Sequence, residues 1–307
     1  MSTARLQGVG AVLVASVLWG TTGTAATFAP DVGPLAIGAA ALGIGGILQA
    51  LIALPALRRA RLHLGSHRGV VLTGGVAVFV YPLAFYSSMH LAGVAVGTVV
   101  SLAFAPVVSG VLERVVDRKA LGRWWFVAAA LGIAGSVLLV ATSDEHPVAS
   151  QTATMIGVLL GLVAGASYAT YSWTAQRLMT QGLGRAAAMG SVFGLGGVML
   201  VPVLLVTGAE FFATPQALAV GAYMALVPMF VGYLAFGYGL SKLPASSATT
   251  LTLTEPAVAT VLAIVIVGES LTAMGWVGLA LFGFVLVILA LSPTASATVA
   301  SARRSQH

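Results

Sequence analysis

Uninterrupted apolar segments of roughly 20 residues recur along the whole chain and limit what it can fold into. A helix of that length crosses a hydrocarbon core about 30 Å thick. Helices satisfy their own backbone hydrogen bonds in lipid, and the alternating pattern of a transmembrane β-strand is absent from these segments. The sequence therefore predicts an all-α integral membrane protein.

Composition excludes several other classes of protein. Of the 307 residues, 59% are hydrophobic and 7% are charged, against about 25% charged in soluble domains. The chain has no cysteine, which excludes disulfides and thiolate metal sites. No metal or other cofactor is expected. Basic residues lie in short loops, so nucleic acid is not an expected partner. The expected contacts are a small-molecule substrate and membrane lipids, and the protein is expected to be monomeric.

Ten apolar segments are predicted to cross the membrane. Their ranges are 7–28, 33–57, 69–91, 94–117, 123–142, 154–180, 186–208, 215–241, 244–268 and 271–292. The first is longer than the apolar core of a signal peptide and lacks a cleavage site of small residues, so it is expected to remain in the mature protein. With the N-terminus in the cytoplasm and alternating sides, all 14 Lys and Arg residues fall on the cytoplasmic side. This predicts ten helices with both termini cytoplasmic, in a bacterial-type inner membrane.

Two halves of the chain resemble each other at a shift of about 150 residues. Leu83-Ala84-Phe85 corresponds to Leu234-Ala235-Phe236, and Pro106 corresponds to Pro256. The polar stretch Thr142–Thr152 separates the halves. Because each half has five predicted helices, an odd number, the second copy enters the membrane from the opposite side. Such inverted repeats are typical of secondary transporters, with a solute site near the midplane. The predicted units are 1–146 and 147–292, followed by a disordered cytoplasmic tail, 293–307.

These features resemble a known family. The two repeats, Leu-Thr-Glu-Pro at 253–256, Val-Gly-Glu-Ser-Leu-Thr at 267–272 and Trp-Gly at 19–20 are similar to EamA-type exporters of the drug/metabolite transporter superfamily. The resemblance covers nearly the whole chain. The aromatic residues of segments 69–91 and 154–180 are further similar to those of bacterial aromatic amino-acid exporters.

The resemblance implies an architecture and an activity. In the family, the first four and the sixth to ninth helices surround a central cavity, and the fifth and tenth pack at the periphery. Members move amino acids, other metabolites or drugs, usually outward. The first half departs from the pattern, with Phe104-Ala105-Pro106 where the second half has Thr254-Glu255-Pro256. A mechanism that needs a carboxylate in both halves is therefore not supported.

Glu255 is the most informative single position. It lies about halfway along segment 244–268, where a carboxylate costs a few kcal/mol and is expected to face the bundle interior or a watery cavity. It could bind a substrate ammonium group or accept a proton during transport. The alternative is a structural role, with a protonated carboxyl bonded to Thr252, Thr254 or freed backbone.

Aromatic and hydroxyl side chains complete the candidate cavity. Aromatic walls with polar groups suit a flat or amphipathic solute, although Tyr and Trp also form belts at membrane interfaces. Serine and threonine hydroxyls could contact substrate or could bond to their own helix. The candidate cavity residues are Trp19, Tyr81, Phe85, Ser101, Tyr168, Tyr171, Tyr238, Thr252 and Glu255.

Prolines within the predicted helices are candidate kinks and gating points. Proline removes a backbone donor and clashes with the preceding turn. The candidates are Pro82, Pro106, Pro228 and Pro256. Proline is also tolerated in membrane helices without any mobile role, so a simple kink remains the alternative.

The favoured function is a secondary transporter that exports neutral or zwitterionic metabolites, above all aromatic and other large neutral amino acids, by alternating access. Alternatives are a passive uniporter or channel, and a flippase for drugs or lipid carriers; anionic carriers would require interior Lys or Arg, which the predicted topology lacks. A membrane enzyme is disfavoured, because Ser167 has no deep histidine in a later segment to act as a base. No phosphate-binding loop for ATP hydrolysis is present.

Overall fold

The computed structural model of the protein describes residues 3–141, 150–262 and 273–291. Within these ranges the regular secondary structure is helical and no strand occurs, so the predicted all-α class is confirmed. Most of the predicted polar linker between the halves, the motif at 267–272 and the predicted tail 293–307 lie outside the described residues.

The first half contains α1 (Thr3–Gly20), α2 (Thr22–Thr27), α3 (Pro34–Arg59), α4 (Arg61–Ser66), α5 (Arg68–Ala92), α6 (Val94–Val115) and α7 (Arg123–Ala141). The second half contains α8 (Gln151–Thr180), α9 (Arg185–Thr207), the 3₁₀ turn η1 (Gly208–Phe212), α10 (Pro215–Met224), the π-helical segment η2 (Ala225–Val231), α11 (Gly232–Leu240), α12 (Ala245–Leu251), the 3₁₀ turn η3 (Thr252–Thr254), α13 (Glu255–Leu262) and α14 (Ala273–Leu291).

Seven helical stretches in the described ranges are long and apolar enough to cross a membrane. They are 3–26, 34–59, 68–92, 96–115, 151–180, 185–212 and 215–240. Two further apolar helices, 123–138 and 273–288, are shorter. The ninth predicted segment is divided into α12, η3 and α13. These helices indicate a multi-pass membrane protein, whereas the count of ten crossings and the cytoplasmic position of both termini remain predictions.

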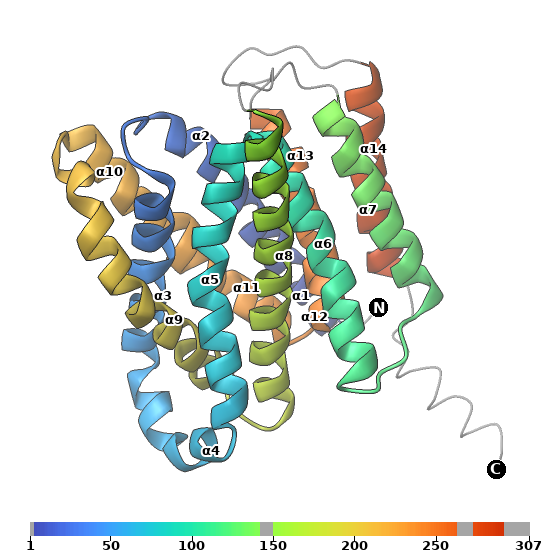
Figure 1. Cartoon of the computed structure of the whole chain (residues 1–307). Coiled ribbons are helices and arrows are strands. Elements are labelled where there is room, and N and C mark those ends of the chain that lie inside the picture. The colour runs from blue at the N-terminus through green and yellow to red at the C-terminus, as the bar shows by residue number, and fades with distance from the viewer. Residues whose placement is uncertain (1–2, 142–149, 263–272, 292–307) are drawn as a thin grey trace.

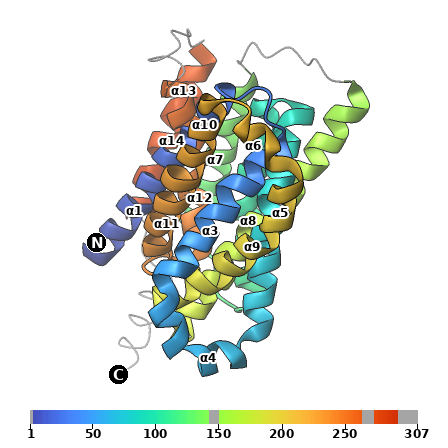
Figure 2. The same cartoon turned by 90° about the vertical axis from the view of Figure 1, so that its left-hand side faces the viewer.

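The long helices stand side by side in one bundle (Figure 1). Helices α7 and α14 pack together at one edge, and α3, α9 and α10 form the opposite side. Helix α4 lies at one end of the bundle, and α10 and α13 reach the other end in both views (Figure 2). We call the α4 end the inner end, since it carries the loop predicted to be cytoplasmic, and the opposite end the outer end.

Helices from the two halves pair with each other throughout the bundle. Helix α3 packs on α9, α5 on α8, α1 on α11, α6 on α12 and α7 on α14. Small residues allow the backbones to approach closely: a methyl group built on Gly197 would lie 2.8 Å from the carbonyl oxygen of Gly43. The halves are therefore interleaved rather than placed next to each other as separate units.

The four predicted kink sites have different local structures. Helices α5 and α6 continue through Pro82 and Pro106. In contrast, Pro228 lies inside the π-helical segment η2, and Pro256 is the second residue of α13, directly after the 3₁₀ turn η3. Proline lacks an N–H, which the first turn of a helix does not need, so the chain restarts a helix at Pro256 without losing a hydrogen bond. Pro106 and Pro256, which correspond to each other in the two halves of the sequence, thus differ in local backbone structure.

Candidate functional site

A small buried cavity lies at the centre of the bundle. Its volume is about 10 Å³, space for about one water molecule. The lining residues come from helices of both halves: Trp19, Thr22, Ala41, Leu42, Tyr81, Pro82, Phe85, Tyr86, Met229, Tyr233 and Glu255. We call this the central cavity. Four of the predicted cavity residues line it, namely Trp19, Tyr81, Phe85 and Glu255, and so does the predicted kink residue Pro82.

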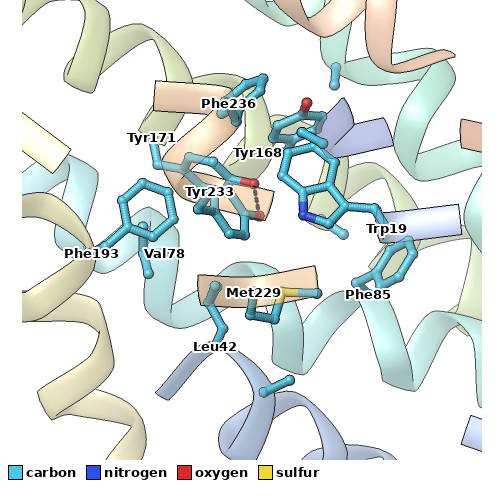
Figure 3. Packing of buried hydrophobic residues seen from close by; sticks show 14 of the residues in the cluster. Trp19, Leu42, Val78, Phe85, Tyr168, Tyr171, Phe193, Met229, Tyr233 and Phe236 are labelled. Atoms are coloured by element: carbon cyan, nitrogen blue, oxygen red, sulfur yellow. Dashed lines mark hydrogen bonds between the residues drawn. The ribbon is translucent and has the colours of Figure 1, made fainter. Parts of the chain in front are cut away.

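Trp19 of α1 is the centre of an aromatic cluster (Figure 3). Its ring centroid lies 4.7 Å from that of Tyr233 and 5.2 Å from that of Phe236. Its indole N–H donates a hydrogen bond to the carbonyl oxygen of Pro228 at 2.9 Å. Because both the ring and the N–H have partners, the indole is held in one orientation, with one face toward the central cavity.

Helix α5 contributes a second aromatic wall. Tyr81 and Phe85 stack with ring centroids 5.5 Å apart and an interplanar angle of 22°. Their spacing of four residues puts them on one helix face. Tyr81 also contacts Tyr168 of α8, with ring centroids 5.7 Å apart. Rings from α1, α5, α8 and α11 therefore form one continuous aromatic centre.

Tyr168 and Tyr171 of α8 lie behind the lining of the central cavity rather than on its surface. The Tyr168 hydroxyl donates to the Oγ1 atom of Thr252 at 2.8 Å. The hydroxyls of Tyr171 and Tyr233 lie 2.5 Å apart and share a hydrogen bond (Figure 3). Thr252 in turn donates to the carbonyl oxygen of Thr249. These bonds connect α8 to η3 and α11, so both tyrosines fix the relative positions of three helices around the cavity.

Glu255 is the first residue of α13, directly after the 3₁₀ turn, and lines the central cavity. Only 7% of its surface is exposed. Helix α1 comes very close here, since a methyl group on Gly20 would lie 3.2 Å from the carbonyl oxygen of Glu255. A carboxylate in the first turn of a helix interacts favourably with the helix dipole, by about 0.3–1 kcal/mol. The restart of the helix therefore offsets part of the cost of a deep carboxylate.

Tyr86 is a cavity residue that the sequence analysis did not select. Its ring is buried, and its hydroxyl makes no hydrogen bond of normal geometry in the part of the chain that the structure describes. The hydroxyl of Thr22, which also lines the cavity, donates to the carbonyl oxygen of Trp19. Tyr86 lies off the face shared by Tyr81 and Phe85, so helical spacing gave no signal for it. It supplies a free phenol group in the same cavity as Glu255.

Two predicted cavity residues lie elsewhere. Ser101 is buried in α6, and its hydroxyl donates to the carbonyl oxygen of Gly97 in its own helix. Tyr238 lies near the inner end, where its hydroxyl donates to Gln7. It is five residues after Tyr233, which turns it by about 140° around the helix and away from the cavity. Neither residue lines the central cavity.

A polar network that the sequence analysis did not predict joins the halves at the inner end. Glu113 of α6 is 2% exposed, and its carboxylate accepts hydrogen bonds from the hydroxyl and the backbone N–H of Ser246, at 2.6 and 3.2 Å. Ser246 belongs to α12 of the second half. This contact therefore holds α6 against α12.

Asp117 extends the same network to α8. It accepts a hydrogen bond from the indole N–H of Trp173 at 2.9 Å and forms ion pairs with Arg177 and Lys119. We call Glu113, Asp117, Trp173, Arg177 and Ser246 the inner network. Acids near predicted helix ends are usually solvated, which is why sequence position alone did not single out Glu113.

Comparisons with known proteins give a consistent result. The sequence profile of the EamA-like transporter family matches residues 6–141 and 155–292. The Bacillus subtilis protein named "Uncharacterized transporter YwfM" is 35% identical over 296 residues, covering 96% of this chain and 97% of the relative. A "Probable terminal-alkyne amino-acid exporter" of Streptantibioticus cattleyicolor is 25% identical over 280 residues, covering 87% and 91%.

A solved crystal structure also has the same fold. It superposes with a TM-score of 0.75 at 17% identity, covering 94% of this chain and 96% of the other. At that level of identity the likeness concerns the fold alone.

Proposed function

Because this chain belongs to the EamA-like transporter family, we propose that it exports large neutral amino acids, aromatic ones above all, across a bacterial cytoplasmic membrane by alternating access. The observation that carries the proposal is the meeting of Glu255 with an aromatic wall in one buried cavity. That combination fits a solute with an ammonium group at one end and an apolar ring or chain at the other.

Each part of such a solute has a partner at the central cavity. The Glu255 carboxylate binds the ammonium group through a charge-assisted hydrogen bond. Trp19, Tyr81 and Phe85 contact the side chain through their ring faces and edges. The free hydroxyl of Tyr86 donates to the solute carboxylate. Among the described lining residues none is basic, which disfavours a purely anionic solute.

Transport requires the central cavity to expand, because about 10 Å³ does not hold an amino acid. The lining residues come from both halves, so a relative movement of the halves enlarges the cavity and opens it to one side. A solute shifts this equilibrium only through different affinities for the two open states. The cavity side chains that touch the solute in one state and not in the other determine that difference.

The pairing of helices supports the inverted-repeat part of the proposal. Numbered by predicted segment, α3–α9 is the pair 2–7, α6–α12 is 4–9 and α7–α14 is 5–10. In two five-helix repeats, segment 1 corresponds to segment 6, 2 to 7, 3 to 8, 4 to 9 and 5 to 10. Each of these three pairs therefore joins a segment to its own counterpart and is unchanged when the repeats are exchanged. The same exchange converts the pair 3–6, α5–α8, into the pair 8–1, α11–α1. This is the pattern expected of two repeats, 1–146 and 147–292, related by a two-fold axis in the membrane plane.

One relative supports an amino acid as substrate and the outward direction. The Streptantibioticus cattleyicolor relative is named a probable amino-acid exporter, and it covers most of the chain. The central cavity described above has the carboxylate and rings that such a substrate needs.

The test measures uptake and efflux of labelled phenylalanine, tryptophan and methionine in proteoliposomes, with and without a pH gradient. Saturable flux that prefers these amino acids over glycine is expected. Glu255→Gln is expected to lower it about 10-fold or more, since a hydrogen bond to a charged group contributes about 1.5–3 kcal/mol. Glu210→Gln is the matched control, because Glu210 lies at the outer end and accepts a hydrogen bond from the backbone of Gly33.

Other outcomes would point to the alternatives. Flux that ignores pH in both the wild-type protein and Glu255→Gln would indicate a passive facilitator. Absence of flux for every amino acid, in vesicles that contain folded protein, would contradict the substrate assignment and direct the search to drugs or lipid carriers.

A further inference from the structure

A second, larger concavity lies at the outer end of the bundle. Its volume is about 490 Å³, within the range of pockets that hold small molecules, about 300–1,000 Å³. Its lining comes from the α1–α2 junction, α2, α10 and the end of α13: Thr21, Thr24, Ala25, Phe28, Gln216, Ala219, Val220, Tyr223 and Leu262. We call this the outer groove.

The outer groove and the central cavity lie along the same helices. Thr21 lines the groove and the next residue, Thr22, lines the cavity. On the eighth predicted segment, Tyr223 lines the groove and Met229 lines the cavity.

Helix α13 repeats this relation. Leu262 lines the groove and Glu255 lines the cavity, a separation of about 10 Å along the helix at 1.5 Å per residue. The eighth predicted segment and α13 thus place the groove outward of the cavity, and Thr21 and Thr22 show that the two linings come close at the α1–α2 junction.

One hydrogen bond joins two of the helical stretches whose residues line both spaces. The hydroxyls of Thr21 and Tyr223 are 2.8 Å apart. Thr21 gives its hydroxyl hydrogen to the carbonyl oxygen of Leu18, at 2.6 Å, so Tyr223 is the donor to Thr21. Thr21 is the residue at which α1 ends and α2 begins, and Tyr223 is in the last turn of α10, just before η2. The bond therefore connects two interruptions of regular α-helix.

The chemistry of the outer groove fits an apolar group. Its described lining contains no charged side chain. Its polar groups are hydroxyls and the amide of Gln216, which donates to the carbonyl oxygen of Phe28. A charged ammonium or carboxylate has no ionic partner there, whereas a ring or branched chain has Ala219, Val220 and Leu262.

We infer that the outer groove is an exit subsite for the apolar side chain of the transported solute, and that the Thr21–Tyr223 hydrogen bond is the gate between it and the central cavity. This rests on the proposed function.

The test uses the absence of native cysteine, so that one introduced thiol is the only reactive site. Ala41→Cys reports on the central cavity and Ala219→Cys on the outer groove. Spheroplasts are treated with a membrane-impermeant thiol reagent without substrate. Ala219→Cys is expected to react quickly and Ala41→Cys slowly. Adding Tyr223→Phe is expected to raise the rate at Ala41→Cys about 3- to 10-fold, as for loss of one neutral hydrogen bond.

Two further variants make the result specific. Thr21→Val removes the same bond from the other side and is expected to give the same increase. Tyr238→Phe removes a tyrosine hydroxyl that bonds to Gln7 at the inner end, and it is expected to leave the rate within about 2-fold. An unchanged rate at Ala41→Cys in both gate variants would overturn the gate.

The subsite is tested by protection. Phenylalanine is expected to slow modification of Ala219→Cys several-fold more than glycine does. Protection by added short-chain phospholipid but not by phenylalanine would make the groove a lipid site and overturn the subsite. The gate measurement needs no substrate, so a rate increase in Tyr223→Phe together with absent amino-acid flux would reject the proposed substrate and retain the gate. Normal amino-acid flux with an unchanged thiol rate would reject the gate and retain the proposed substrate.

Discussion

The two ends of the bundle are closed by different kinds of contact. At the inner end, the carboxylates of Glu113 and Asp117 hold α6 against α12 and α8 through hydrogen bonds and ion pairs. At the outer end, the neutral hydroxyls of Thr21 and Tyr223 share a bond beside a groove of about 490 Å³, and two other bonds between the halves, from Gly33 to Glu210 and from Gln216 to Phe28, are exposed. Bonds to charged groups are roughly twice as strong as neutral ones. The inner end is therefore the more firmly closed of the two.

Under the proposed alternating-access function, this difference biases the transport cycle toward outward opening. From the conformation described here, opening outward breaks bonds that are neutral or exposed, whereas opening inward breaks the buried bonds of the Glu113 carboxylate. An exporter that releases solute outward requires a low free-energy cost for opening the outer end and a higher cost for opening the inner end. The inner network and the Thr21–Tyr223 bond together provide that asymmetry, and it can be altered one contact at a time.

Glu113→Ala should have the largest effect. It leaves the hydroxyl and N–H of Ser246 buried without an acceptor, at a cost of about 1–3 kcal/mol for each group. With Ala41→Cys as reporter, the thiol rate in inverted membrane vesicles should rise about 30-fold or more, and the rate from the outside should fall. Glu113→Gln, which keeps the size of the side chain, should show a smaller rise. An unchanged inner rate in both variants would mean that Glu113 does not close the inner end.

Ser246→Ala should give the next largest effect. The backbone N–H of Ser246 still donates to Glu113, and only the hydroxyl bond at 2.6 Å is lost. The thiol rate at Ala41→Cys from the inner side should rise about 3- to 10-fold. If Ser246→Ala matched the effect of Glu113→Ala, the backbone bond would contribute nothing and the interpretation of the network would be wrong.

Asp117→Asn should have a smaller effect that depends on salt. The amide oxygen still accepts from Trp173, while the ion pairs with Arg177 and Lys119, both partly exposed, are lost. Partly exposed pairs contribute about 0.2–1 kcal/mol and are screened by salt. The inner thiol rate should rise about 2- to 5-fold at low salt and approach that of the parent protein at 1 M NaCl, where the Debye length is about 3 Å. A salt-independent increase would instead indicate a change in packing.

Tyr238→Phe should have the smallest effect at the inner end. The hydroxyl bond to Gln7 is exposed, and the cations of Arg185 and Lys242 lie 5.1 and 5.7 Å from the ring and would remain there. The inner thiol rate should change less than about 2-fold. A change as large as that of Ser246→Ala would show that the inner closure extends beyond the inner network to α11 and α1.

Sequence patterns predicted the membrane class, the family and part of the site. The deep carboxylate and the shared face of Tyr81 and Phe85 follow from position and helical spacing alone, and the structure brings both to the central cavity. Ser101 and Tyr238 do not line it. Whether a hydroxyl meets the cavity or its own helix depends on the rotation of the helix, which residue type does not determine.

The inner network could not be predicted for a different reason. Glu113 stands one turn before Asp117 near a helix end, and at such a position a solvated acid is the usual outcome. Its burial depends on α12 of the other half, which begins at Ala245 and brings Ser246 against it. That contact spans more than a hundred residues of sequence, and no local pattern encodes it.

The π-helical segment η2 also affects how the chain can change in length over evolution. Hydrogen bonds in a π-helix join residues five apart instead of four, so the segment holds an extra residue within an otherwise α-helical path. Loss of one residue there would restore α geometry and leave Tyr233 and Phe236 facing Trp19. Loss of one residue from a regular helix such as α9 would turn every following side chain by about 100°. The eighth helix can therefore lose a residue at this point without replacing the aromatic side chains at the centre of the bundle.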